Sequence, residues 1–118
     1  MTSQITGHTG LYALLGSPVA HSISPMMHNE AFRLLGIDAV YLAFDVGTDH
    51  FAQAVNGLRQ VNIKGFNVTM PNKNLMAELA DELSPAARLG GAVNTVVNDN
   101  GRLIGHTTDG IGYMMAAK

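Results

Sequence analysis

Short apolar runs alternate along the chain with stretches in which apolar residues recur every three or four positions. The runs have the length of buried strands, and the stretches have the spacing of amphipathic helices. The predicted strands cover residues 11–16, 39–46, 63–69 and 92–97, and Asn100-Gly101 predicts a tight turn from which residues 102–106 return. This order predicts an α/β protein: a mostly parallel open sheet with helices on both faces, three layers in all, and one terminal β-hairpin.

Serine–proline pairs predict where two of the helices begin. Ser24-Pro25 and Ser84-Pro85 each offer a serine side chain as the N-cap and a proline at the first helical position. Helical spacing predicts these buried residues: Met27, Ala31, Leu34 and Leu35 in the first helix; Phe51, Val55 and Leu58 in the second; Leu75, Leu79 and Leu83 in a helix beginning at Pro71. A last helix is expected to begin near Thr108-Asp109.

Polar residues follow the predicted strands where open α/β sheets bind ligands, beyond the carboxyl ends of the strands. The candidates are Ser22 and Ser24 after the first strand, Thr69 and Lys73 after the third, Asn94 within the fourth, and Asp109 after the hairpin. With the strands in the predicted directions, hydroxyls, an amide, an ammonium and a carboxylate from distant segments meet at one edge of the sheet.

Ser22 and Ser24 suit an anion, whereas the contact partner of Asn94 is left open by the sequence. Ser22 and Ser24 lie at a helix start, where hydroxyls, backbone N–H groups and the helix dipole favour a carboxylate. The structural alternative makes Ser24 an N-cap and Ser22 a turn residue. Asn94 interrupts an apolar strand, and because a buried amide needs hydrogen bonds, it contacts either a loop or a ligand.

Lys73 and Asp109 are the candidate pair for proton transfer. A cation in the first turn of a helix opposes the helix dipole, which makes Lys73 a poor choice for stability. A lysine whose site adjusts its pKa suits general acid–base chemistry, and Asp109 would hold its ammonium. The alternatives are a solvated lysine and an aspartate that only caps a helix.

Composition excludes several classes of protein. The 118 residues fit one domain, and a net charge of −2 without a basic run argues against nucleic acid as a partner. No apolar run reaches the roughly 20 residues of a membrane span, and no secretory signal is recognised, so we expect a cytoplasmic protein. The chain lacks cysteine, its five histidines lack metal-binding spacing, and no glycine-rich phosphate loop follows a strand. Neither a metal site nor a nucleotide site is therefore predicted.

Four segments resemble, in family order, the motifs of the shikimate dehydrogenases. They are residues 14–32 (LLGSPVAHSISPMMHNEAF), 65–73 (GFNVTMPNK), 91–95 (GAVNT) and 108–112 (TDGIG). The resemblance implies the substrate-binding domain of an enzyme that reduces 3-dehydroshikimate to shikimate with NADPH. It also implies roles: Ser22 and Ser24 hold the substrate carboxylate, Thr69, Lys73, Asn94 and Asp109 bind ring hydroxyls, and Lys73 and Asp109 form the catalytic pair.

The resemblance also implies a second, Rossmann domain for the nicotinamide cofactor, which this sequence does not contain. Only 14% of the residues are charged, against about 25% in typical domains. We therefore expect residues 1–118 to be one domain of a longer enzyme, with no bound cofactor and no turnover alone. Thr107 stands where many family members have asparagine.

Alternatives stay open for both ligand and assembly. One is a relative that prefers quinate, and another is a non-catalytic module that binds a small hydroxy-carboxylate. The sequence does not decide between NAD and NADP or between a monomer and a homodimer.

Overall fold

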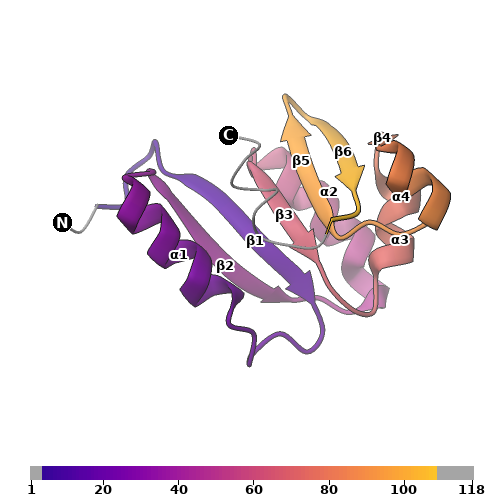
Figure 1. Ribbon diagram of the computed structural model, residues 1–118, viewed down its shortest axis with the longest axis horizontal. Coiled ribbons are helices and arrows are strands. Elements are labelled where there is room, and N and C mark those ends of the chain that lie inside the picture. Colours follow the sequence, from indigo (N-terminus) through magenta and orange to yellow (C-terminus); the bar gives the residue numbers. More distant parts are fainter. Residues whose placement is uncertain (1–3, 109–118) are drawn as a thin grey trace.

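Within residues 4–108, six strands form a single sheet in the order β2-β1-β3-β5-β6-β4 (Figure 1). The strands are β1 (Gly10–Gly16), β2 (Ala39–Asp45), β3 (Gly65–Val68), β4 (Glu82–Leu83), β5 (Thr95–Asp99) and β6 (Arg102–His106). β1 pairs in parallel with β2 and β3, and β5 runs antiparallel to β3 and β6. The computed structural model describes residues 4–108. The mostly parallel open sheet and the β5–β6 hairpin confirm the predicted fold class.

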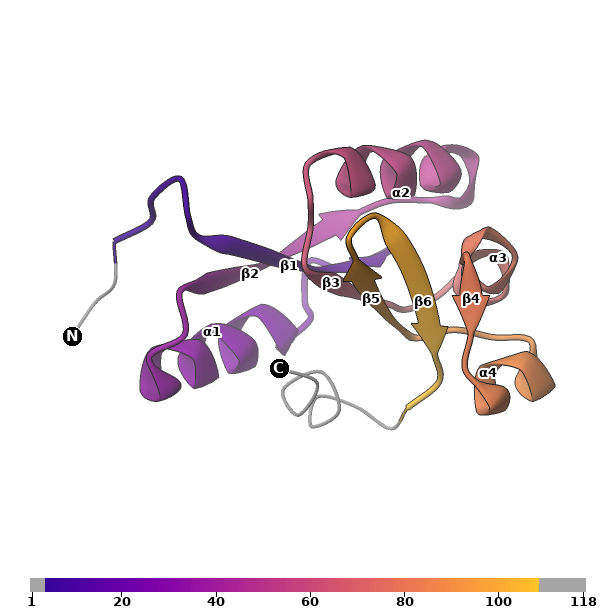
Figure 2. The same ribbon diagram turned by 90° about the horizontal axis from the view of Figure 1, so that it is seen from above.

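Helices pack on both faces of the sheet (Figure 2). They are α1 (Ser24–Leu35), α2 (Phe51–Gln60), which follows the short 3₁₀ turn η1 (Thr48–His50), α3 (Lys73–Leu79) and α4 (Pro85–Gly90). On one face, Phe32 of α1 joins a core with Tyr12, Leu14, Val19 and Tyr41. On the other face, α2, α3 and α4 contribute Phe51, Val55, Met76 and Ala87 to a larger core around Leu15 and Phe66.

The buried face of α1 differs from the prediction. His28 and Phe32 are the buried residues of this helix. The side chains expected inside are largely outside: Met27, Leu34 and Leu35 are 43%, 69% and 64% exposed. Because α1 carries apolar residues on more than one side, helical spacing alone fits two faces. The ring of Tyr12, whose centroid lies 5.3 Å from that of Phe32, favours the face with the aromatic residue.

Some predicted element boundaries were wrong. Leu83 lies in β4 and not in a helix, since α3 ends at Leu79 and the backbone of Asp81 then bonds to Leu103 of β6 (N···O 2.8 Å). Ser24 is the first residue of α1, and Ile23 occupies its N-cap. The cap predicted for α4 is confirmed, because Ser84 Oγ accepts the Ala87 N–H at 3.2 Å.

His28 is a buried histidine in an apolar contact. Its ring stacks on that of Tyr41 with centroids 4.1 Å apart and an interplanar angle of 4°. Within residues 4–108, no hydrogen-bond partner reaches its Nδ1 atom. Burial lowers the pKa of His28 below its ordinary value of 6.5, because the charged imidazolium is poorly solvated there.

The stability of the fold should depend on pH through His28. Below pH 6.5, His28 binds a proton in the unfolded chain and resists protonation in the folded chain. The contribution of His28 to the free energy of unfolding is therefore undiminished above this pH, and it falls as the pH drops toward the lower pKa of the folded state. We expect the loss of stability between about pH 7.5 and about pH 5.5 to be smaller in His28→Gln. Urea denaturation at both pH values measures the free energy of unfolding, and His21→Gln, at an exposed histidine, is the control. An unchanged loss in His28→Gln would contradict this account.

Candidate functional site

The strand directions bring the candidate segments to one edge of the sheet. The parallel strands β1, β2 and β3 end at this edge, where Gly16 is in register with Asp45. β5 is antiparallel to β3, so it begins at the same edge, with Thr95 opposite Asn67. β6 ends there with His106 opposite Thr95. The loops after β1, β3 and β6 and the segment before β5 therefore form one rim.

Backbone hydrogen bonds join these loops to one another. Ser17 N–H donates to Met70 O at 3.0 Å, Thr69 N–H to Leu15 O at 2.9 Å, Val93 N–H to Lys73 O at 3.0 Å, and Asn94 N–H to His106 O at 3.0 Å. The peptide bonds Ser17–Pro18 and Met70–Pro71 are cis. The rim is thus a continuous hydrogen-bonded surface built from four separate segments.

Gly16 allows two of the loops to meet closely. A Cβ atom at this position would overlap the Thr69 side chain and lie 3.0 Å from Met70 O. Glycine therefore lets Thr69 lie directly against the end of β1.

A cavity of about 350 Å³ opens at the rim. It is lined by Leu14, Pro18, Val19, His21, Ser22, Ser24 and Thr69. The structure thus brings three of the predicted site residues, Ser22, Ser24 and Thr69, around one hollow with an apolar side. Met70, which follows Thr69, does not line this cavity and is 70% exposed.

The serines are well arranged to receive an anion. Ser22 Oγ accepts the Ser24 N–H at 3.1 Å, which leaves the hydroxyl hydrogen of Ser22 available as a donor. Ser24 is the first residue of a 12-residue helix, whose N-terminal end carries partial positive charge. The side chain of Ile23, at the N-cap, makes no capping hydrogen bond. A carboxylate in this cavity would therefore meet donors and a favourable dipole.

Lys73 lies on the same rim, outside the residues that line the cavity. It is the first residue of α3, its side chain is half-buried, and none of the ion pairs among the described residues includes it. Buried Asn72 anchors this helix start: its Oδ1 accepts the Thr48 hydroxyl at 2.8 Å, and its Nδ2 donates to Val46 O at 3.4 Å. The backbone that carries Lys73 is thus fixed. Asp109, its predicted partner, lies outside the described residues.

Asn94 precedes β5 and does not lie within a strand, which corrects the prediction. Its amide bonds to a loop: Nδ2 donates to Thr108 O, and Oδ1 accepts the Thr108 N–H at 2.9 Å. The same oxygen accepts the Thr95 hydroxyl at 3.0 Å. The sequence left open whether Asn94 contacts a loop or a ligand. Among the described residues, Asn94 contacts the loop after β6.

Sequence reasoning missed Tyr41 and Asn67, which extend this network. The buried Tyr41 hydroxyl donates to Asn67 Oδ1 at 2.8 Å, and Asn67 Nδ2 donates to Thr95 Oγ1 at 3.2 Å. Burial raises the pKa of Tyr41 well above its usual value, and a hydrogen bond with the Ser24 side chain lowers it by less, so the phenol remains a donor. The signal in the sequence was Asn67 itself, a polar residue between two apolar strand residues.

A second cavity of about 480 Å³ lies on the opposite face, between the end of β2 and α2. Its lining is mainly apolar: Leu15, Phe44, Asp45, Val46, Ala54, Gly57, Leu58 and Val61. Although it is larger, it lacks the convergent polar groups that orient a ligand, so the rim cavity is the better candidate.

Some site types find no support in the part of the chain that the structure describes. Residues 4–108 contain no cluster of three or more His, Asp or Glu side chains that could hold a metal ion. None of the described helices has the length and apolar character that crossing a membrane requires. No glycine-rich loop joins a described strand to a following helix, so these residues do not fit a dinucleotide.

A family model and a curated relative both match this chain to shikimate dehydrogenases. The family model described as the shikimate dehydrogenase substrate binding domain matches residues 14–96. The shikimate dehydrogenase (NADP(+)) of Listeria monocytogenes is 58% identical over 118 residues, which is all of this chain and 40% of that enzyme. The chain therefore spans well under half the length of this curated relative.

Solved structures agree with the sequence comparison. The crystal structure of the Listeria monocytogenes shikimate 5-dehydrogenase in complex with shikimate and NAD matches 98% of this chain and 40% of that chain, with a TM-score of 0.88. The ligand-free 5-ketofructose reductase of a Gluconobacter strain is 33% identical, with a TM-score of 0.86, over 95% of this chain and 40% of that chain. The fold thus occurs in enzymes named for different substrates.

Proposed function

This chain belongs to the shikimate dehydrogenase family through its substrate-binding domain, and on that premise we propose that it binds shikimate and 3-dehydroshikimate for NADPH-dependent interconversion. Residues 1–118 form the substrate-binding domain in this proposal. The observation that carries it is the rim cavity, where Ser22, Ser24 and Thr69 meet on the edge of the sheet that also bears Lys73.

The serine end of the cavity binds the carboxylate. The Ser22 hydroxyl and the N-terminus of α1 offer donors and positive potential, and the Ser24 hydroxyl lies beside them. Thr69 lines the same cavity and contacts the hydroxylated ring. Holding the carboxylate far from the reacting carbon fixes which face of the ring is presented for reaction.

Lys73 and Asp109 move the proton. Side chains cannot supply a hydride, so a nicotinamide cofactor held outside residues 1–118 would supply it when bound. Negative charge then develops on the ketone oxygen, where the Lys73 ammonium stabilises it and delivers a proton. Asp109 orients the ammonium, and Asn94 donates to a ring hydroxyl.

The cofactor is held by sequence outside residues 1–118. The relatives carry more than half of their length beyond the matched region, and the described residues fit no dinucleotide. The isolated chain is therefore expected to bind shikimate without turnover. The cytoplasm is its proposed compartment, and the homodimer stays a prediction that analytical ultracentrifugation tests.

A second candidate is the reduction of a keto sugar, which the likeness to the 5-ketofructose reductase favours. A sugar of that kind has no carboxylate, so the donors of Ser22 and the α1 N-terminus would lack an anion. Quinate keeps the carboxylate and differs in the ring, so it tests the ring contacts alone. Activity measured with shikimate, with quinate and with a keto sugar therefore separates the candidate functions.

The experiment joins residues 1–118 to the part of the Listeria monocytogenes enzyme that lies beyond its matched region; we call this protein the joined enzyme. NADPH oxidation is followed with 3-dehydroshikimate and with 5-ketofructose, and NADP⁺ reduction with shikimate and with quinate. We expect turnover with shikimate and 3-dehydroshikimate, and none from the isolated chain. Preference for 5-ketofructose, or no turnover with shikimate by a folded joined enzyme, would contradict the proposal.

A further inference from the structure

Asn94 makes more hydrogen bonds to the protein than a residue that only contacts a ligand would make. Its Oδ1 accepts from the Thr108 N–H at 2.9 Å and from the Thr95 hydroxyl at 3.0 Å. Its Nδ2 donates to Thr108 O. A carbonyl oxygen has two lone pairs and an amide nitrogen has two hydrogens, so the bonds within residues 4–108 use one of the two N–H groups of Asn94.

The two bonds to Thr108 fix the direction of the Asn94 amide. One comes from the backbone N–H and the other goes to the backbone C=O of the same residue, so a rotated amide would set donor against donor and acceptor against acceptor. The pair also fixes the backbone at Thr108. Thr108 lies two residues after the end of β6 and directly before Asp109 in the sequence.

A directional chain of hydrogen bonds supports Asn94 from inside the sheet. The Tyr41 hydroxyl donates to Asn67 Oδ1 at 2.8 Å, and Asn67 Nδ2 donates to Thr95 Oγ1 at 3.2 Å. The Thr95 hydroxyl in turn donates to Asn94 Oδ1. These hydrogen bonds run from Tyr41 of β2, past β1, to Asn67 of β3 and on to Thr95 of β5. Tyr41 and Thr95 are 0% and 1% exposed. Connected hydrogen bonds of this kind favour one arrangement of their members.

We propose that Asn94 is a positioning residue that fixes the backbone at Thr108, the residue directly before Asp109 in the sequence, with Thr95 holding Asn94 in place. This inference rests on the proposed function for the role of Asp109, and it assigns Asn94 a task besides ligand binding. A residue that only binds the ligand affects KM, whereas a residue that also places a catalytic carboxylate affects kcat.

The first test measures amide hydrogen exchange at Thr108 in residues 1–118 without ligand. We expect Asn94→Ala to accelerate exchange at this amide by about tenfold, and Thr95→Val by less, since a lost hydrogen bond is worth about 0.5–1.5 kcal/mol. Thr95→Ser keeps the hydroxyl and should keep the protection. Thr9→Val, at the opposite edge of the sheet, is the matched control. Unchanged exchange in Asn94→Ala, or equal exchange in Thr95→Val and Thr95→Ser, would overturn the inference.

The second test separates kcat from KM in the joined enzyme. We expect Asn94→Ala to lower kcat with shikimate about tenfold as well as raising KM, and Thr95→Val to lower kcat in the same direction, with Thr95→Ser restoring it. A raised KM with unchanged kcat would overturn the positioning role. If the unsubstituted joined enzyme has no shikimate turnover, the proposed function fails, while exchange at Thr108 still decides whether Asn94 holds that backbone.

Discussion

Replacing Lys73 with alanine in the joined enzyme should lower kcat by about 10²–10⁴-fold, the usual range for general acid–base catalysis. The KM for shikimate should change far less, because the ammonium acts on charge that develops only in the transition state. The fixed start of α3, anchored by Asn72, places this lysine on the rim beside the cavity. Steady-state rates at saturating shikimate and NADP⁺ measure the effect.

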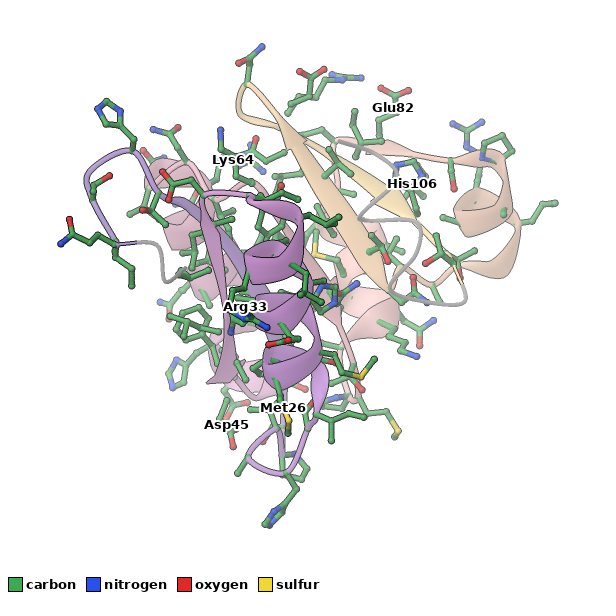
Figure 3. All side chains as sticks on the ribbon, turned by 60° about the vertical axis from the view of Figure 1, so that its left-hand side comes forward. Met26, Arg33, Asp45, Lys64, Glu82 and His106 are labelled. Carbon is green, nitrogen blue, oxygen red and sulfur yellow. The ribbon has the colours of Figure 1, made fainter. Side chains whose placement is uncertain are left out.

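Lys64 provides the matched control. It is an exposed lysine just before β3, at the end of the sheet opposite to Met26 and Asp45 (Figure 3). Lys64→Ala removes the same charge from the protein and should leave kcat unchanged. If kcat of Lys73→Ala stays within about tenfold of the unsubstituted enzyme, about 1.4 kcal/mol of barrier, Lys73 is not the proton donor.

Removing both serine hydroxyls should have the second largest effect, on binding. The double variant Ser22→Ala/Ser24→Ala is expected to weaken shikimate binding to residues 1–118 by about 100-fold or more, because hydrogen bonds to a charged group are worth about 1.5–3 kcal/mol each. Isothermal titration calorimetry measures the dissociation constants. The helix dipole and backbone donors remain, so residual binding is expected.

The methyl ester of shikimate shows whether the serines act on the carboxylate. The ester carries no negative charge, so the double variant should lose much less affinity for it than for shikimate. Ser84→Ala serves as a control, because it removes a serine that caps α4 by accepting the Ala87 N–H. Equal losses for shikimate and its ester would show that the serines support the fold or the ring and do not hold the carboxylate.

The sequence was sufficient to predict five of the six described strands and their common edge. Apolar runs such as residues 11–16 define buried strands regardless of their neighbours, and Asn100-Gly101 sets the hairpin locally. Parallel pairing then places the carboxyl ends of the strands together. The meeting of Ser22, Ser24 and Thr69 around one cavity follows from this topology.

Features that depend on tertiary contacts were not predictable from the sequence. The buried face of α1 is selected by the rings of Tyr12 and Tyr41 on the sheet, which pack against Phe32 and His28. Spacing along the helix carries no information about those partners. The end of α3 at Leu79 is likewise decided by pairing with β6, since the chain from Asp81 onward bonds to that strand.

The hydrogen bonds of Asn94 illustrate the same limit within the site. The sequence indicated that this amide needs partners, but Thr108 lies 14 residues away and comes close only because the hairpin returns. Tyr41 and Asn67 are separated by 26 residues and meet across the sheet. Sequence reasoning therefore predicted polar groups at the rim, but it missed Tyr41 and Asn67 and did not predict the hydrogen bonds between these groups.

The position of shikimate in a crystal of residues 1–118 shows whether the rim cavity binds the substrate. We expect the carboxylate within hydrogen-bond distance of the Ser22 and Ser24 hydroxyls, with the ring against Thr69 and directed toward Lys73. A competing polar cavity of about 240 Å³ lies at the opposite edge, lined by Asn62, Ile63, Lys64, Asn98, Asn100 and Gly101. Shikimate bound there, or with its carboxylate turned away from both serines, would contradict the account.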